Sequence, residues 1–270
     1  MTTSELLSSA WDGGPVVIAI FVAAAVAYRV LSRGQRLVRP GYLVTAFAVL
    51  VLSLASPIAV LARDYLFCAH MLQHLLLVLI VPPLALLSLP GTESNAGSSR
   101  PVARLALWQW GLGVGAMWLW HAPTLCNAAS RSLPVHGFQL LSLLAMGTAF
   151  WWPIFGPHAQ RRLAPLGAMV YLFTACVACT VLGVFVTFSP VAVCSVYVHP
   201  VDRLGALSLL RDGWGLAPKA DQEIGGLLMW VPACIVYAVA ILAMLRRYYR
   251  EGDLTIAAAD LMPQPATEET

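Results

Sequence analysis

Two histidines one helical turn apart, His70 and His74, begin the long apolar stretch "HMLQHLLLVLIVPPLALLSLP" (70–90). On a helix, residues i and i+4 project from one face, about 6 Å apart along the axis. Two imidazoles placed in this way can chelate one metal ion, as they do in the H-E-x-x-H zinc helix. Here the second position is Met71 rather than glutamate, so the general base of a metalloprotease is missing. The pair is therefore better suited to holding a metal than to hydrolysis.

Membrane helices must position these histidines, because the chain has the composition of a membrane protein. Its 270 residues are 59% hydrophobic and 11% charged, whereas a soluble domain carries roughly a quarter charged residues. A spanning helix needs about 20 mainly apolar residues, and seven segments qualify: 15–32, 41–61, 66–89, 102–121, 136–155, 165–188 and 224–245. The sequence predicts an all-α polytopic membrane domain over residues 1–250, a bundle of seven transmembrane helices, followed by a disordered cytoplasmic tail over 251–270. Pro82 and Pro83 are expected to kink or break the third segment.

The basic residues predict the direction of the helices, because the cytoplasmic loops of membrane proteins are enriched in Lys and Arg. With the N-terminus outside, eleven of the sixteen basic residues fall on the cytoplasmic side: Arg29, Arg33, Arg36, Arg39, Arg100, Arg104, Arg161, Arg162, Arg246, Arg247 and Arg250. We therefore predict that the N-terminus lies outside and the C-terminus in the cytoplasm. The chain has no basic stripe of the kind that binds nucleic acid.

In this topology five of the six histidines lie at the outer ends of helices or in outer loops. Ionisable groups at membrane depth are costly and usually face a bundle interior or a cavity. A single interfacial histidine is ordinarily a hydrogen-bonded group, but four from three helices on one side of the membrane favour a binding site. The predicted metal ligands are His70, His74, His121 and His136, and His199 lies in the long outer connection 189–223.

Sulfur donors near the same boundary indicate which metal would bind. Met71, Met117 and Met229 lie within about two helical turns of the outer boundary, and Cys68 is on the same side. Imidazole combined with thioether or thiolate donors suits copper, above all Cu(I). Methionine also fills apolar helices without any ligand role, and Cys68 points roughly 200° away from His70 on an ideal helix. These residues are therefore expected to support the site rather than to define it.

The other cysteines do not form a dense framework. Cys126 and Cys194 both lie in outer loops, and the sequence leaves open whether they form a disulfide. Cys176 and Cys179 have C-x-x-C spacing but fall in the middle of an apolar segment. Thiols in such surroundings are most simply small core residues, so a redox role is not expected.

Two acidic residues stand just before predicted helices on the outer side. Asp64 precedes the third segment and Asp221 the seventh. An acid in this position caps the helix or favours its first turn through the helix dipole, which is the interpretation we favour. The alternative is that either carboxylate orients a ligating imidazole, as carboxylates often do around metals.

The ordered motifs of the chain resemble one known family. They are "FCAHMLQHLLLVLIVPPLALL" (67–87), "WLWHAP" (118–123), "HGFQLLSLLAMGTAFWWPIFGP" (136–157), "TFSP" (187–190) and "DQEIGGLLMWVP" (221–232). In this order they resemble the seven-span CtaG family of cytochrome c oxidase assembly factors, which is associated with caa-type oxidases. The resemblance covers most of residues 60–250.

The resemblance implies a non-enzymatic assembly factor in the bacterial cytoplasmic membrane. Its role would be to handle or deliver copper, at the outer face of the membrane, for the haem–copper centre of an oxidase. The implied partners are oxidase subunit I, an extracytoplasmic copper donor protein and the lipid bilayer.

The resemblance also assigns residues. The family's histidine motifs match the four predicted ligands, and its aspartate–glutamine motif matches Asp221 and Gln222. Family members often carry a second histidine one turn after the position of His136, where this chain has Leu140. His199 or a cysteine is a candidate to complete the ligand set.

Two alternatives to copper handling remain open at this stage. A membrane haem protein would take axial imidazoles from two helices, for example His74 and His136, but would leave one of the paired histidines unused. A purely structural scaffold for oxidase assembly would bind no metal at all. Enzymatic catalysis is not expected, because the sequence shows no nucleophile–base set and no phosphate loop.

Overall fold

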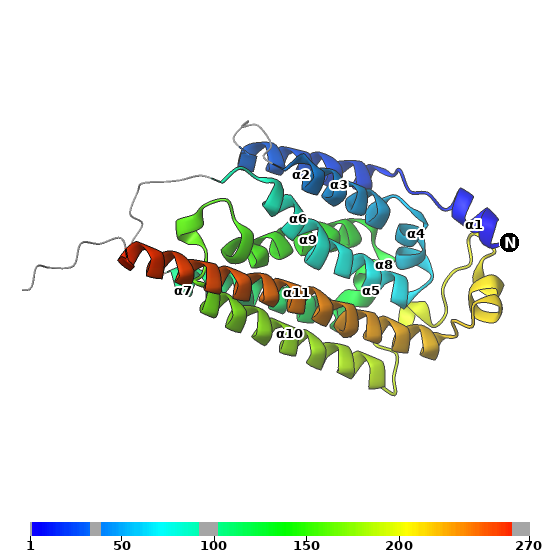
Figure 1. The fold of residues 1–270 in the computed structure, drawn as a ribbon. Coiled ribbons are helices and arrows are strands. Elements are labelled where there is room, and N and C mark those ends of the chain that lie inside the picture. Colours follow the sequence, from blue (N-terminus) through cyan, green and yellow to red (C-terminus); the bar gives the residue numbers. More distant parts are fainter. Residues whose placement is uncertain (1, 33–38, 92–101, 261–270) are drawn as a thin grey trace, which may run out of the picture.

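The computed structural model describes residues 2–32, 39–91 and 102–260, which form a bundle of long helices (Figure 1). In these ranges the regular structure is helical throughout and contains no strand, as an all-α fold requires. The main elements are α1 (Thr3–Ser9), α2 (Pro15–Ser32), α3 (Pro40–Leu54), α4 (Pro57–Asp64), α5 (Phe67–Leu75), η1 (Leu76–Ile80), α6 (Val81–Ser88), α7 (Val102–Trp120), α8 (Pro123–Arg131), α9 (Leu133–Phe155), η2 (Ala159–Arg161), α10 (Pro165–Phe188), η3 (Ser195–Tyr197), η4 (Leu209–Gly213) and α11 (Pro218–Asp260). Many of them begin with proline, whose missing N–H is not needed in the first turn of a helix.

Five helices are long and apolar enough to cross a membrane: α2, the run Phe67–Ser88, α9, α10 and α11 as far as Gly252. α3 and α4 qualify together as a sixth, bent by 43°. α7 lies in the bundle against α9 and α10, but Arg104, Gln109 and four tryptophans make it less apolar than the others. By helix length and apolar composition, the described part of the chain is a multi-pass membrane protein with five or six spans. The predicted count of seven is not confirmed.

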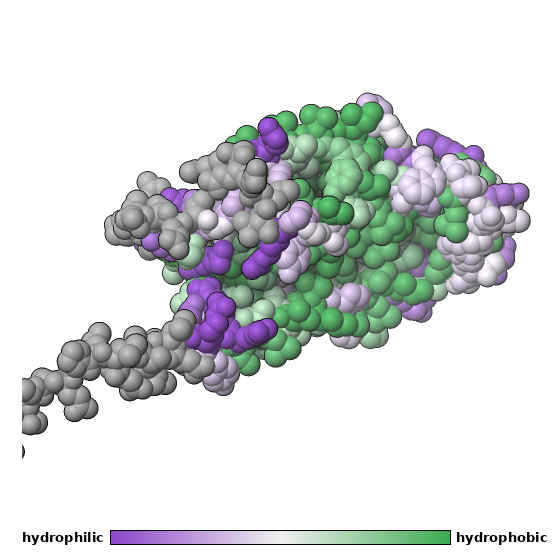
Figure 2. Space-filling model, turned by 45° about the horizontal axis from the view of Figure 1, so that its top comes forward, coloured by the Kyte–Doolittle hydropathy of each residue, from purple (hydrophilic) through white to green (hydrophobic). Residues whose placement is uncertain are grey.

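The molecular surface has the pattern that a bilayer requires. Apolar side chains cover the middle of the bundle, and polar side chains gather at its two ends (Figure 2). Large apolar residues point outward from several spans, among them Val22, Phe173 and Ile235, each more than half exposed. In water such a surface would be unfavourable, whereas lipid tails solvate it.

The third span is continuous, although two prolines were expected to kink or break it. The five residues of η1, immediately before α6, are π-helical, so the chain runs from α5 through η1 into α6 without interruption. Pro82 has no N–H for the carbonyl of Val78, four residues earlier. The indole Nε1 of Trp151 on α9 donates to that carbonyl instead, at 3.0 Å. At Gly147 the two helices approach so closely that a Cβ would lie 3.0 Å from the Cα of Val78.

The last helix is longer than the sequence predicted. α11 extends to Asp260, so residues 251–260 are helical rather than part of a disordered tail. The remaining tail residues, 261–270, lie outside the described residues. Arg247 and Glu251 form an i,i+4 ion pair at 2.7 Å. This pair helps the helix to continue beyond its apolar part.

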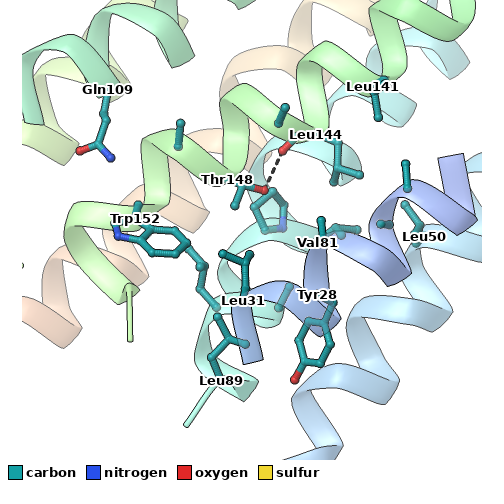
Figure 3. A pocket seen from close by; sticks show the side chains of 18 of the residues that line it. Tyr28, Leu31, Leu50, Val81, Leu89, Gln109, Leu141, Leu144, Thr148 and Trp152 are labelled. Carbon is teal, nitrogen blue, oxygen red and sulfur yellow. Dashed lines mark hydrogen bonds between the residues drawn. The ribbon is translucent and has the colours of Figure 1, made fainter. Parts of the chain in front are cut away.

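One large cavity between the described helices does not contain the predicted ligands. It has a volume of about 720 Å³ and lies between α2, α3, α6, α7 and α9. Apolar side chains such as Tyr28, Leu50, Leu144 and Trp152 line it (Figure 3). Its lining includes no histidine, cysteine or methionine. Metal chemistry must therefore be sought elsewhere in the bundle.

Candidate metal centre

Three helices bring the four predicted ligands together at one end of the bundle. His70 and His74 lie on α5, His121 directly follows α7, and His136 is in the first turn of α9. Their exposed fractions are 0%, 2%, 5% and 5%, so all four are buried. The ring centroids of His70 and His74 are 4.1 Å apart, those of His74 and His121 5.5 Å, and those of His70 and His136 6.4 Å. These distances define one histidine cluster.

Several ring nitrogens in the histidine cluster have no partner. The Nδ1 atoms of His70 and His136 and both ring nitrogens of His74 are buried without a hydrogen bond. Buried polar atoms are almost always satisfied, so orphaned atoms call for an explanation such as an ion. Within the described ranges, no group of three or more His, Cys, Asp or Glu side chains is placed so that it could hold a metal ion. A metal lies about 2 Å from an imidazole nitrogen, so binding requires the rings to rotate from the positions seen. The donor set fits a metal in number and chemistry.

His121 is the best-anchored ring of the cluster. Its Nδ1 lies 2.5 Å from the backbone carbonyl of Met117, one turn earlier. A carbonyl can only accept, so Nδ1 carries the hydrogen, and in the neutral ring Nε2 keeps a lone pair. That Nε2 faces the Met71 sulfur at 3.0 Å. The ring is therefore fixed in the tautomer that a metal ligand needs.

Two residues that the sequence analysis did not single out complete the surroundings of the cluster. Gln139 on α9 is fully buried, and its Nε2 lies 3.5 Å from Nε2 of His70. Its spacing from His136, i+3 on a helix, is the signal that could have identified it. The ring of Tyr197, from η3, lies 5.9 Å from the ring of His70. Burial raises the pKa of the Tyr197 hydroxyl, which donates to the carbonyl of Ala62 at 2.7 Å.

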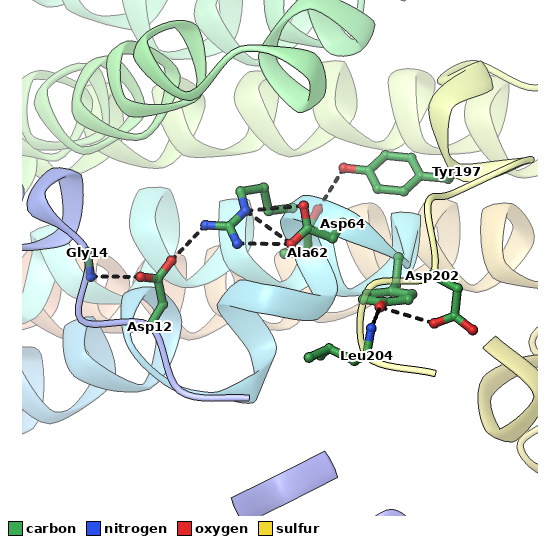
Figure 4. A network of polar contacts seen from close by, with 9 residues as sticks. Asp12, Gly14, Ala62, Asp64, Tyr197, Asp202 and Leu204 are labelled. Carbon is green, nitrogen blue, oxygen red and sulfur yellow. Dashed lines mark hydrogen bonds and ion pairs between the residues drawn. The ribbon is translucent and has the colours of Figure 1, made fainter. Parts of the chain in front are cut away.

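A polar network is built on residues 63–65, at the end of α4 (Figure 4). Arg63 pairs with Asp12 at 2.8 Å and with Asp64 at 2.9 Å. The Tyr65 hydroxyl lies 3.2 Å from Asp202 and accepts from the backbone N–H of Leu204. These contacts join the N-terminal segment, α4 and the long connection before α11. Asp64 is the last residue of α4 and pairs with Arg63. It therefore neither caps the start of a helix nor contacts an imidazole.

The aspartate–glutamine motif holds the backbone around the cluster. Asp221 lies in the first turn of its own helix, as predicted, but its carboxylate accepts from the backbone N–H groups of Phe67 and Cys68 at 2.7 and 2.8 Å. It therefore caps α5, which has no side-chain cap of its own. Gln222 accepts from the backbone N–H of Val193 at 2.9 Å, and its amide also donates to carbonyls in the last turn of α10 and in the connection after it. Neither side chain bonds an imidazole.

The Asp221→Asn variant is expected to lose stability. Each carboxylate oxygen accepts one of these two N–H groups, whereas asparagine has a single acceptor oxygen, so one buried N–H loses its partner and we expect a loss of about 2 kcal/mol. The measurement is the thermal unfolding midpoint of the purified protein in detergent. Glu223→Gln is the matched control, because Glu223 makes only an exposed ion pair with Lys219 at 3.8 Å. Equal midpoints for the two variants would contradict the capping role.

The other predicted residues fall outside the cluster. His199 is exposed, and Cys68 is half-buried as a free thiol. Leu140, which occupies the position of the family's second histidine, packs in an apolar cluster with Val17 and Ile20. His199 therefore does not complete the buried ligand set.

Two cysteine pairs lie close together. Cys126 and Cys194 form a disulfide that joins α8 to the connection after α10, which decides the question the sequence left open. Cys176 and Cys234 face each other across α10 and α11 with sulfurs 3.2 Å apart. Cys179 is a buried free thiol on α10.

The fold and the site together define a class of protein: a multi-pass helical membrane protein with a buried histidine cluster at one end of the bundle. Comparison with family models gives a match over residues 19–251 to the cytochrome c oxidase caa3 assembly factors, Caa3_CtaG. The chain belongs to this family. Comparisons with curated proteins and with solved structures gave no match.

Proposed function

We propose that this protein binds copper as Cu(I) in the histidine cluster, at the outer face of the bacterial cytoplasmic membrane, and passes it to subunit I of a haem–copper oxidase during assembly. The observation that carries the proposal is the set of buried ring nitrogens without partners on His70, His74 and His136. The chain's family is described as cytochrome c oxidase assembly factors, which supports an oxidase as the recipient. A copper donor protein on the outer side would load the site.

The chemistry of the cluster supports carrying a metal rather than catalysis. Neutral imidazoles offer lone pairs without adding charge, and their burial excludes water and competing anions. The nearest polar neighbours, Gln139 and Tyr197, are neutral as well. Burying the single charge of Cu(I) among neutral donors costs less than burying a divalent ion. This arrangement supports a non-enzymatic role.

We also propose the full topology of seven spans, with α7 as one of them and the N-terminus outside. Successive long helices alternate in direction, so α1 and the C-terminal end of α11 lie at opposite ends of the bundle (Figure 1). Arg104 lies in the first turn of α7, whose other end precedes His121, and Arg161 and Arg162 follow α9, whose first turn carries His136. These arginines are therefore at the opposite ends of the two helices from the cluster, and the positive-inside rule supports an outer position for the cluster. Labelling of a single cysteine at Ser4 in intact cells by an impermeant reagent tests this, and labelling only after lysis would contradict it.

The function is tested in cells that carry the His70→Ala/His74→Ala variant in place of the natural protein. We expect the oxidase to retain its haem while its copper content falls by about tenfold or more, since mutations around metal sites lower affinity on this scale. The exposed residue His199 supplies the control variant His199→Ala. An oxidase with full copper and activity in the double variant would instead support a metal-free scaffold.

The structure gives no support to the haem alternative. A haem needs room for its whole macrocycle between two axial imidazoles. The cavity that borders His74 has a volume of about 20 Å³. Such a space holds about one water molecule. A macrocycle would have to displace several packed side chains.

A further inference from the structure

A small cavity lies directly below the histidine cluster, towards the middle of the bundle. Its volume is about 20 Å³, room for about one water molecule or one ion. Methionines from three helices line it, namely Met71 on α5, Met117 on α7 and Met229 on α11. His74 borders it from the cluster side, and Cys179 and Tyr237 border it from below. All three methionines are at least nine-tenths buried.

Beside this cavity, Nε2 of His121 and the sulfur of Met71 are in contact without a hydrogen atom between them. Nε2 of His121 keeps its lone pair, because Nδ1 donates to the Met117 carbonyl, and it faces the sulfur of Met71 at 3.0 Å. A thioether sulfur has no hydrogen to donate. Two lone pairs therefore face each other at hydrogen-bond distance. A cation bound by both atoms would turn this contact into an attraction.

His74 provides a further donor at the same place. Both of its ring nitrogens are buried without a partner, and its ring stands at 90° to that of His121. The ring is 2% exposed, so bulk solvent does not reach these atoms. His74 therefore joins the histidine cluster to the methionine-lined cavity.

We propose that the cargo is held as Cu(I) on a mixed imidazole–thioether site formed by His74, His121 and Met71, with Met117 and Met229 as additional sulfur donors. The inference rests on the proposed copper function and specifies its ligands. Thioethers are soft, neutral donors that select Cu(I) over Zn(II) and over hard cations. His70 and His136 then form the outer half of the cluster, one turn nearer the membrane surface, where an incoming ion would first meet imidazole.

The test compares metal affinities of the purified full-length protein and its methionine variants. Cu(I) and Ag(I) are the soft probes and Zn(II) is the borderline one. We expect Met71→Leu and Met229→Leu to weaken Cu(I) and Ag(I) binding by about tenfold or more, with Zn(II) affinity nearly unchanged. Met244→Leu is the matched control, a buried methionine of α11 away from the cavity. X-ray absorption of the Cu(I) form should show at least one sulfur neighbour.

Two results would contradict the proposed imidazole–thioether site. If Met71→Leu and Met229→Leu bind Cu(I) as tightly as Met244→Leu, and the absorption spectrum shows only nitrogen neighbours, the copper function stands but the thioether site is wrong. If the natural protein binds no Cu(I), the copper function itself fails, and this inference fails with it. Leucine conserves the volume of methionine, so the variants are expected to fold, and their thermal midpoints should match that of Met244→Leu.

Discussion

The His70→Ala/His74→Ala variant is expected to bind Cu(I) at least about 100-fold more weakly than the natural protein, because one ligand of the inner site and one imidazole of the outer half are removed together, and changes in the surroundings of a metal alone cost 10–100-fold. The two rings lie 4.1 Å apart at the centre of the cluster, and His74 also borders the methionine-lined cavity. The measurement is a competition titration with a chromophoric Cu(I) chelator. Both proteins are titrated at the same pH, since protons compete with copper for imidazole.

The control for this variant is His199→Ala, which removes an exposed histidine from the same side of the protein. Its affinity should equal that of the natural protein. A double variant that binds Cu(I) as tightly as His199→Ala would show that the cluster is not the binding site. The buried rings would then need another explanation for their unpaired nitrogens.

Removal of the disulfide in the Cys126→Ser/Cys194→Ser variant is expected to lower the free energy of unfolding by about 4 kcal/mol, because the bridge closes a long loop. The two cysteines are 68 residues apart in sequence. The bridge also holds the connection that carries Tyr197, whose ring covers His70. The measurement is the thermal midpoint in detergent, with and without reductant.

Reductant should lower the midpoint of the natural protein and leave that of the double serine variant unchanged. The Cys176→Ala variant, altered at a free thiol inside the bundle, should respond to reductant as the natural protein does. A natural protein whose midpoint is insensitive to reductant, and equal to that of the serine variant, would contradict a stabilising role for the bridge.

The candidate site could be predicted from the sequence to the extent that it depends on local spacing. His70 and His74 share a helix face because of their i,i+4 spacing, and the ends of two other apolar segments predict where His121 and His136 lie. Contacts between distant segments carry no such signal. Asp221 caps a helix more than 150 residues away in sequence, and Tyr197 reaches the cluster from an irregular connection. Gln139 is fully buried, but in the sequence it looks like any other polar residue of a membrane helix.

The fold, like the site, could be predicted where it depends on local sequence patterns and not where it depends on contacts between distant segments. Apolar length predicted most of the helices, but not that residues 41–61 would divide into α3 and α4 with a 43° bend. Two prolines predicted a kinked or broken third span, and the sequence alone does not reveal that Trp151 replaces the lost N–H donor at Val78. The acidic composition of 251–260 predicted disorder, whereas the start of this segment is helical and pairs with Arg247.

The central claim is that buried imidazoles from three helices bind copper. Metal content and the optical spectrum, recorded on one sample of the natural protein purified from cells grown with copper and haem, test it most directly. The account predicts about one copper ion per chain, no Soret band, and loss of the copper in the His70→Ala/His74→Ala variant purified alongside. A protein that carries haem, or one that holds no copper in either form, would contradict it.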